Sequence, residues 1–337
     1  MPDLNLDNEA VRDEIREIFR FWLDRGADGF RLDAVTSYYT DETAENIAFL
    51  AWVNDTVKGI KKDAYLVAEC WADMETYAKY YSSGVDSFFD FAFAGSEGYI
   101  AALARGKKDA SFYGKKLAEE EKLFAGYGAE TVNAPFYTNH DMARSAGYFT
   151  RDDGSRVKLA QALNLLMPGQ AFLYYGEELG MKGSGKDENK RAPMYWNADP
   201  EAEGMCSGPA DMDEVKMKFE SEDAQDADPY SILSYVRNVI RIRTSYPAVS
   251  LGKTVRIKEL SGKKVCVIRR DAPGYPSVWL VFNMSDEAQE LDISGPEMPA
   301  FSEITDMLCV SEEKAELSDG RLILPPFGIS LFASFPQ

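Results

Sequence analysis

Three carboxylates in this sequence stand where a parallel sheet would bring them together. Asp33 ends the apolar run of "ADGFRLDAV", Glu69 ends that of "AYLVAECW", and Asp141 closes "APFYTNHD". Their spacings are 36 residues (69 − 33) and 72 residues (141 − 69). One βα unit takes about 30 or more residues, so these spacings correspond to one unit and two units. Because strand ends converge on one face of a closed β/α barrel, we expect the three carboxylates to share a site.

Three convergent carboxylates suit glycoside hydrolysis with retention of configuration, in which an ionised carboxylate attacks the sugar and a protonated one donates to the leaving oxygen. Arg31 lies two residues before Asp33, on the same side of the strand, and would keep Asp33 ionised as a nucleophile. Glu69 has apolar neighbours and Trp71 beside it, so burial would raise its pKa and keep it protonated as an acid. A lone Asp at a strand end more often caps a helix. The regular spacing, with Arg31 and His140 alongside, favours a site.

The elements that position these residues follow from the hydrophobic pattern. Apolar residues at helical spacing predict helices over residues 8–25 and near 43–62. Between the helical segments lie short apolar runs that predict buried strands, near residues 27–35, 64–71, 85–93, 134–141 and 170–181. This alternation is typical of a parallel sheet. We therefore expect the first domain, residues 1–250, to be part of a (β/α)8 barrel.

The amino-acid composition of the sequence changes after about residue 182. Residues 182–213 are rich in Gly, Pro, Asp and Asn and predict a long loop, which in a compact domain usually has a function. A last helix is expected within residues 230–249. From Leu251 onward, short alternating runs predict a small antiparallel β-domain over residues 251–337.

Composition excludes several classes of function. The net charge of −19 argues against binding to nucleic acid, which needs a basic face. No apolar run approaches the length of a membrane span. The four cysteines are scattered without metal spacing and there is a single histidine, so we predict no metal site and no cofactor. Free thiols favour a cytoplasmic location, although any secretion signal would lie upstream of Met1.

Several segments resemble one known family. "GFRLDAV", "LVAECW" and "FYTNHD" are similar to the second, third and fourth conserved regions of the α-amylase superfamily, glycoside hydrolase family 13. "YYGEELGMKGSGKDENKRAPMYW" resembles the segment around the eighth strand of that family's barrel. The resemblance implies that Asp33 is the nucleophile, Glu69 the general acid/base and Asp141 the stabiliser of the transition state.

The resemblance also implies three substrate-binding residues. Arg31 would orient the nucleophile, and His140 would hydrogen-bond the sugar at the cleavage point. Arg191, in "KRAPMYW", matches an arginine that contacts the donor-side sugar in related α-glucosidases. The alternative for Arg191 is an ion pair that orders the loop.

The first residues, "MPDLN", resemble the family's fifth conserved region, which lies near the end of the insertion after the third barrel strand. We therefore expect the chain to carry strands four to eight and the C-terminal domain, without the first three strands and most of domain B. Met1 would then be an internal methionine, or the chain a cut piece, and this piece alone is expected to be inactive. Calcium remains possible in a longer form, but Thr36 and Ser37 replace the Lys-His pair of calcium-dependent members.

The resemblance leaves four functions open. The leading hypothesis is hydrolysis of α-1,4-linked glucans or maltooligosaccharides, because Ala34, after the nucleophile, is smaller than the valine common in relatives that cut α-1,6 bonds. The alternatives are transglycosylation as in trehalose synthases, which uses the same covalent intermediate, or oligo-1,6-glucosidase activity. The fourth is a non-catalytic sugar-binding module, which the presence of all three carboxylates disfavours.

Overall fold

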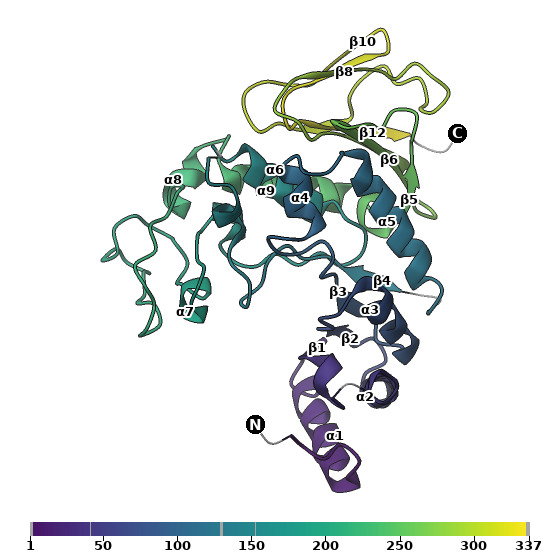
Figure 1. Cartoon of the computed structure of the whole chain (residues 1–337), viewed down its shortest axis with the longest axis vertical. Helices are drawn as coiled ribbons and strands as arrows, with labels where there is room; N and C mark the ends of the chain where they lie inside the picture. Colours follow the sequence, from purple (N-terminus) through teal and green to yellow (C-terminus); the bar gives the residue numbers. More distant parts are fainter. Residues whose placement is uncertain (1–2, 41, 129–130, 152, 335–337) are drawn as a thin grey trace. The chain divides into compact units, whose positions relative to one another are not determined.

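The computed structural model describes residues 3–40, 42–128, 131–151 and 153–334 (Figure 1). Met1 and Pro2, on which the interpretation of "MPDLN" partly rests, lie outside the described residues. Within the described part of the chain, no helix is both long and apolar enough to cross a membrane.

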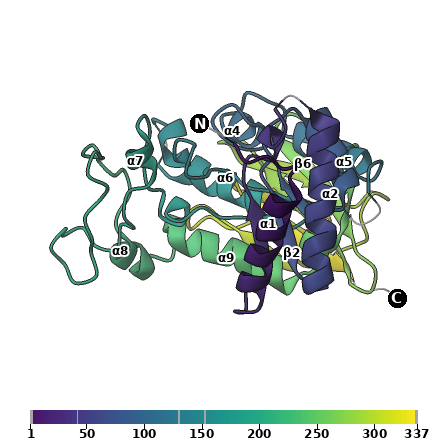
Figure 2. The same ribbon diagram turned by 90° about the horizontal axis from the view of Figure 1, so that it is seen from below.

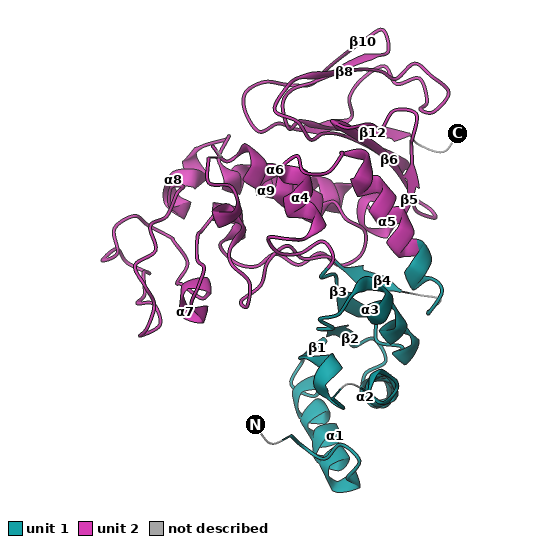
Figure 3. Cartoon of the chain, in the orientation of Figure 1, with its two compact units in different colours: residues 1–91, 122–134 teal, residues 92–121, 135–337 magenta. Residues whose placement is uncertain are grey.

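The chain forms two compact units, shown in different colours in Figure 3. Unit 1 consists of residues 1–91 and 122–134, and unit 2 consists of residues 92–121 and 135–337. The predicted boundary at residue 250 stays a prediction, although the first antiparallel strand does begin shortly after it, at Lys253.

Unit 1 is built around a parallel sheet with strand order β1-β2-β3-β4. Its strands are β1 (Gly29–Leu32), β2 (Tyr65–Ala68), β3 (Ser87–Phe89) and β4 (Val132–Ala134). Its helices are α1 (Glu9–Leu23), α2 (Thr43–Ile60) and α3 (Met74–Tyr80), with 3-10 turns η1 (Val35–Ser37) and η2 (Tyr81–Ser83). Leu32, Leu66 and Phe88 share a buried core with the helices, and α1 and α2 lie side by side (Figure 2). The opposite sheet face carries Arg31.

The helices of unit 1 begin and end where the sequence predicts. The Asn8 side chain caps α1 by accepting a hydrogen bond from the Ala10 amide at 2.9 Å, and Gly26 follows the helix with a φ of +97°. The helices predicted over residues 8–25 and 43–62 are thus confirmed as α1 and α2.

The helices of unit 2 enclose a large apolar core. They are α4 (Tyr99–Ala104), α5 (Ser111–Phe124, whose last turn belongs to unit 1), η3 (Ser145–Tyr148), α6 (Ser155–Leu165), η4 (Glu177–Leu179), α7 (Asp187–Lys190), α8 (Glu222–Ala227), α9 (Ile232–Ser245) and α10 (Ala248–Leu251). α6 and α9 lie side by side in both views and share this core (Figures 1 and 2). The helix predicted within 230–249 is confirmed as α9.

The C-terminal part of unit 2 consists of two antiparallel sheets, as predicted. The strands are β5 (Lys253–Arg256), β6 (Val265–Asp271), β7 (Ser277–Asn283), β8 (Gln289–Asp292), β9 (Asp306–Leu308), β10 (Glu316–Ser318), β11 (Arg321–Leu324) and β12 (Ile329–Ser334). They form a five-stranded sheet, β5-β6-β7-β12-β9, and a three-stranded sheet, β10-β11-β8. Alternating residues of β7 bury both faces of the larger sheet, with Val281 toward one core and Phe282 toward the helices.

Two predicted strands differ from the structure. The strand expected over 134–141 is β4, which ends at Ala134. The strand expected over 170–181 is not formed, so that prediction was wrong. The Phe172 amide donates a hydrogen bond to the Pro135 carbonyl at 2.8 Å. The Asn164 side chain donates to the Phe172 carbonyl at 3.1 Å, and the Arg144 guanidinium donates to the Tyr175 carbonyl.

Candidate active site

The first group of predicted site residues lies at the carboxyl ends of β1 and β2 in unit 1. The parallel register pairs Arg31 with Val67 and Leu32 with Ala68, so the next positions are Asp33 and Glu69. The Glu69 amide donates to the Leu32 carbonyl at 2.8 Å, and the Val35 amide donates to the Glu69 carbonyl at 3.0 Å. The sheet therefore sets the two carboxylates opposite each other.

Arg31 binds both carboxylates at once. Its Nη1 donates to Asp33 Oδ1, and its Nη2 lies 3.1 Å from Glu69 Oε2. A guanidinium presents its donors in a planar fork, which fixes the orientation of both partners. The Asp33 side chain is 74% exposed, so it is open to a ligand as well as paired. Arg31 was predicted to orient Asp33; its contact with Glu69 was not predicted.

Glu69 differs from Asp33 in its surroundings. It is only 7% exposed, and burial raises the pKa of its carboxyl group, as its apolar neighbours predicted. The charge of Arg31 and the Ala34 amide act in the opposite direction, while the neighbouring Asp33 carboxylate raises the Glu69 pKa further. Trp71, two residues on, is itself 58% exposed and stacks on Phe91 with ring centroids 4.8 Å apart.

Ala34, between the nucleophile candidate and η1, has left-handed backbone geometry with φ +40° and ψ +50°. Residues other than glycine rarely adopt this conformation. It directs the Ala34 amide toward Glu69 Oε2, at 3.3 Å. Together with the Val35 amide, this turn ties Glu69 to the end of β1, a role that the sequence reasoning missed.

The second group surrounds Asp141 in unit 2. Arg191 Nη2 lies 3.0 Å from Asp141 Oδ1, and His140 Nε2 lies 3.3 Å from Asp141 Oδ2. The Asn139 side chain accepts from the Asp141 amide at 2.9 Å, which fixes the turn. Lys190 donates to the Asp141 carbonyl at 3.0 Å. The turn that carries Asp141 is therefore tied to the loop that carries Arg191.

The structure thus brings the six predicted residues together in two groups. Asp33, Glu69 and Arg31 form one in unit 1; Asp141, His140 and Arg191 form the other in unit 2. The alternative for Arg191 was an ion pair that orders the loop. Such an ion pair is present, since Arg191 Nη1 also lies 3.3 Å from Asp187 Oδ2. Its sugar contact stays a prediction.

Two further residues were missed by the sequence reasoning. Tyr38 lies near the Arg31–Asp33 pair: burial raises the pKa of its hydroxyl to about 12, and the Asp33 charge adds to the shift. Lys190 precedes Arg191 in the quoted motif, and that adjacency was the available signal. Across the described ranges, no three His, Cys, Asp or Glu side chains gather closely enough to hold a metal ion.

Comparison with known proteins adds the decisive observation. The family model described as the alpha amylase catalytic domain matches residues 1–252. The chain belongs to the α-amylase family. The predicted fold class is therefore confirmed: a (β/α)8-barrel type followed by an antiparallel β-domain.

Individual members of the α-amylase family resemble the chain over much of its length. Alpha-amylase 3 of Dictyoglomus thermophilum is 33% identical over 304 residues, which covers 87% of this chain and 59% of that protein. A trehalose synthase of Thermus thermophilus is 25% identical over 385 residues, covering 99% of this chain and 39% of that protein. The solved structure of Eubacterium rectale Amy13B has a TM-score of 0.96 at 42% identity, and the match covers 100% of this chain and 65% of that one.

Proposed function

We propose that the protein is a retaining glycoside hydrolase that acts on α-1,4-linked glucans or maltooligosaccharides through a covalent glycosyl-enzyme intermediate. Asp33 is the nucleophile, Glu69 the general acid/base and Arg31 the residue that orients both. The observation that carries the proposal is the Arg31 guanidinium, which binds an exposed carboxylate and a buried one at the ends of adjacent strands.

The spacing of the carboxylates supports retention. Carboxyl groups of retaining enzymes lie about 5–5.5 Å apart, whereas inverting enzymes need about 6.5–9.5 Å to admit a water molecule. One guanidinium that contacts both Asp33 and Glu69 is compatible with the shorter separation. The division of roles is supported by burial, because the raised pKa of Glu69 favours its protonated form and Asp33 remains paired with a cation.

The reaction proceeds in two displacements. The Asp33 carboxylate bonds to the anomeric carbon while the glycosidic C–O bond breaks, and the Glu69 proton passes to the departing oxygen. Glu69, now ionised, then takes a proton from water, whose oxygen bonds to the anomeric carbon as the Asp33 ester bond breaks. Each displacement inverts the anomeric carbon, so the product keeps the α configuration.

The Asp141 group belongs to the proposal by resemblance to the family. Asp141 would stabilise the positive charge that develops on the sugar, and His140 and Arg191 would hydrogen-bond it. The arrangement supports this assignment because Arg191 and His140 contact different oxygen atoms of the Asp141 carboxylate.

The substrate class is the finer part of the proposal. The name of the D. thermophilum relative supports amylase activity, and the small side chain of Ala34 favours α-1,4 over α-1,6 bonds. Transfer of the glucosyl group to a sugar is the second candidate, favoured by the similarity to a trehalose synthase. It differs only in the acceptor that attacks the Asp33 ester.

A mechanism-based fluorinated α-glycosyl fluoride tests the proposal in a form of the protein as long as its family relatives, since residues 1–337 alone are expected to be inactive. It should esterify the Asp33 carboxylate, detected by peptide mass spectrometry, and the Asp33→Asn variant should not be labelled. NMR of early products from maltotriose should show the α anomer, and incubation with maltose should show whether water or sugar is the acceptor. A label on another carboxylate, or early β product, would overturn the assignment.

A further inference from the structure

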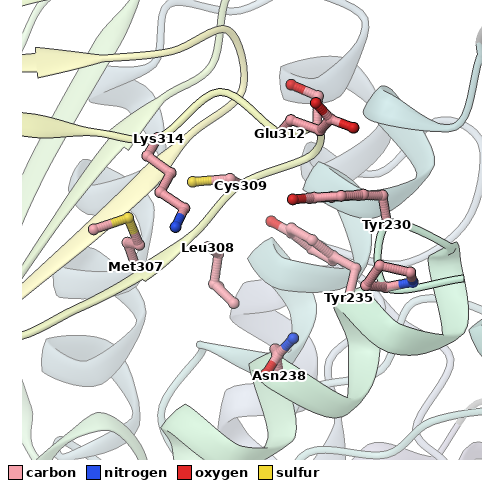
Figure 4. A pocket seen from close by; sticks show the side chains of 10 residues that line it. Tyr230, Tyr235, Asn238, Met307, Leu308, Cys309, Glu312 and Lys314 are labelled. Atoms are coloured by element: carbon pink, nitrogen blue, oxygen red, sulfur yellow. The ribbon is translucent and has the colours of Figure 1, made fainter.

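A pocket lies within unit 2, between α9 and the segment that follows β9 (Figure 4). Its volume is about 170 Å³, and it shares no residue with either candidate active-site group. In Figure 4, Tyr230 and Tyr235 extend from the start of α9 toward the segment that carries Cys309. We call it the α9–β9 pocket, defined by Tyr230, Tyr235, Asn238, Leu308, Glu312 and Lys314.

The walls of the α9–β9 pocket are held apart at a fixed distance. The buried Lys158 ammonium group donates to the Tyr230 carbonyl on one wall and, at 2.8 Å, to the Val310 carbonyl on the other. Arg241 on α9 binds Asp306 on β9 through two hydrogen bonds of 2.7 and 2.8 Å. A pocket held open in this way costs a ligand little reorganisation.

The lining of the α9–β9 pocket combines apolar surface with polar groups. The two tyrosine rings and Leu308 provide the apolar part. Asn238, Glu312 and Lys314 line the pocket with exposed polar side chains. The hydroxyl group of Tyr235, a residue that is only 4% exposed, is buried without a hydrogen-bond partner in the described part of the chain. Small-molecule sites typically have this character, with apolar and aromatic walls and a few polar groups that orient the ligand.

The volume, charge and polarity of the α9–β9 pocket indicate the kind of ligand that fits it. A cavity of about 150 Å³ accommodates one benzene ring, so the α9–β9 pocket has room for a single six-membered ring. Glu312 and Lys314 balance in charge, which disfavours both anions and cations. A purely apolar ligand would leave the buried hydroxyl group of Tyr235 without a hydrogen-bond partner. A pyranose fits both surfaces, because its polarised C–H groups can face the negative faces of the tyrosine rings while its hydroxyl groups donate and accept.

We propose that the α9–β9 pocket binds one neutral pyranose ring, a glucose unit of an α-glucan chain. This identification of the ligand rests on the proposed function. The pocket presents a single carboxylate, Glu312, so it binds sugar without cleaving it. A glucan held there raises the effective concentration of the rest of the chain around the enzyme.

The test uses the methyl group of Met307, which also lines the pocket, as a local reporter in the whole chain. With ¹³C-methyl methionine, titration with maltotriose should shift the Met307 resonance, which the Met307→Leu variant identifies. Tyr230→Ala and Asn238→Ala should each weaken binding about fivefold, the loss expected for one ring contact or one hydrogen bond. Tyr275→Ala, which removes an exposed tyrosine outside the pocket, should leave binding unchanged.

Three results would overturn the site: a Met307 resonance that does not move, a Tyr230→Ala variant that binds like the wild type, or inorganic phosphate shifting the resonance as strongly as maltotriose. The proposed function fails separately. If the protein shifts Met307 on titration but never forms the Asp33 ester, the pocket stands and the hydrolase assignment falls. If the ester forms while Met307 stays in place, only the pocket assignment falls.

Discussion

The left-handed backbone geometry of Ala34 predicts how substitutions beside the proposed nucleophile change the stability of the protein. Ala34 is one of three non-glycine residues with positive φ in the described part of the chain, and the other two lie in the C-terminal β-domain. Because glycine adopts this geometry without steric cost, Ala34→Gly should stabilise the protein, whereas Ala34→Val should destabilise it.

The magnitudes follow from two opposing terms. Left-handed geometry costs an alanine about 1–2 kcal/mol, which glycine recovers. Glycine also lowers the free energy of unfolding by about 0.5–1 kcal/mol relative to alanine, because it gives the unfolded chain more conformational freedom. The net expectation for Ala34→Gly is a gain of about 0.5–1 kcal/mol in the free energy of unfolding. A β-branched side chain is a genuine outlier at this geometry, so Ala34→Val should cost about 1–2 kcal/mol.

Urea unfolding followed by fluorescence measures both changes as shifts of the midpoint at constant slope. Ala48, exposed in the middle of α2 of the same unit, is the matched control. There, Ala48→Gly should destabilise by about 1 kcal/mol, because glycine is a poor helix former. The glycine effect should therefore have opposite signs at the two positions. If Ala34→Gly is as destabilising as Ala48→Gly, the inferred strain at Ala34 is absent.

Three further predictions concern ionisable groups. Asp33→Asn, made in a form of the protein as long as its family relatives, should lower kcat by several orders of magnitude with an unchanged urea midpoint, because an amide cannot form the ester; a tenth of wild-type activity would contradict this. A raised carboxyl pKa means that the folded state binds more protons than the unfolded state, so wild-type stability should fall as pH rises from the ordinary pKa of Glu69 through its raised value. Glu69→Gln should remove that slope, and pH-dependent urea midpoints that keep it would show that another group is responsible. Glu121 pairs with the fully buried Arg270 at 3.1 Å, so Glu121→Gln should cost about 3 kcal/mol in a urea titration, whereas Glu119→Gln, in an exposed pair, should change stability by less than about 0.5 kcal/mol.

The positions of the first group of site residues at neighbouring strand ends were predictable from two simple repeats. Period-two alternation places Arg31 and Asp33 on one side of a strand, and parallel pairing then brings the next strand end, Glu69, opposite. The same alternation places Leu32 on the opposite side of the strand, where it is buried. Nothing beyond strand periodicity and the repeat length of a βα unit is needed for this part.

Other features depend on partners that are distant in sequence. Near residues 170–181, where the predicted strand is not formed, carbonyl groups accept hydrogen bonds from the side chains of Asn164 and Arg144, which no local pattern reveals. The α9–β9 pocket depends on Lys158, more than 70 residues from Tyr230 and about twice as far from Val310. The left-handed geometry of Ala34 is contrary to the usual preference of alanine, so propensity points away from it.

The two carboxylates of unit 1 also regulate each other during the proposed reaction. In the free enzyme, the Asp33 carboxylate helps to raise the pKa of Glu69, which is the direction that proton donation in the first displacement requires. When Asp33 becomes an ester, that negative charge disappears, while Arg31 remains 3.1 Å from Glu69. The pKa of Glu69 must then fall, since a raising influence is removed and a lowering one is retained. The lower pKa suits the second displacement, in which ionised Glu69 takes a proton from water. In the proposed reaction, the guanidinium that the two carboxylates share would therefore help Glu69 to act first as an acid and then as a base.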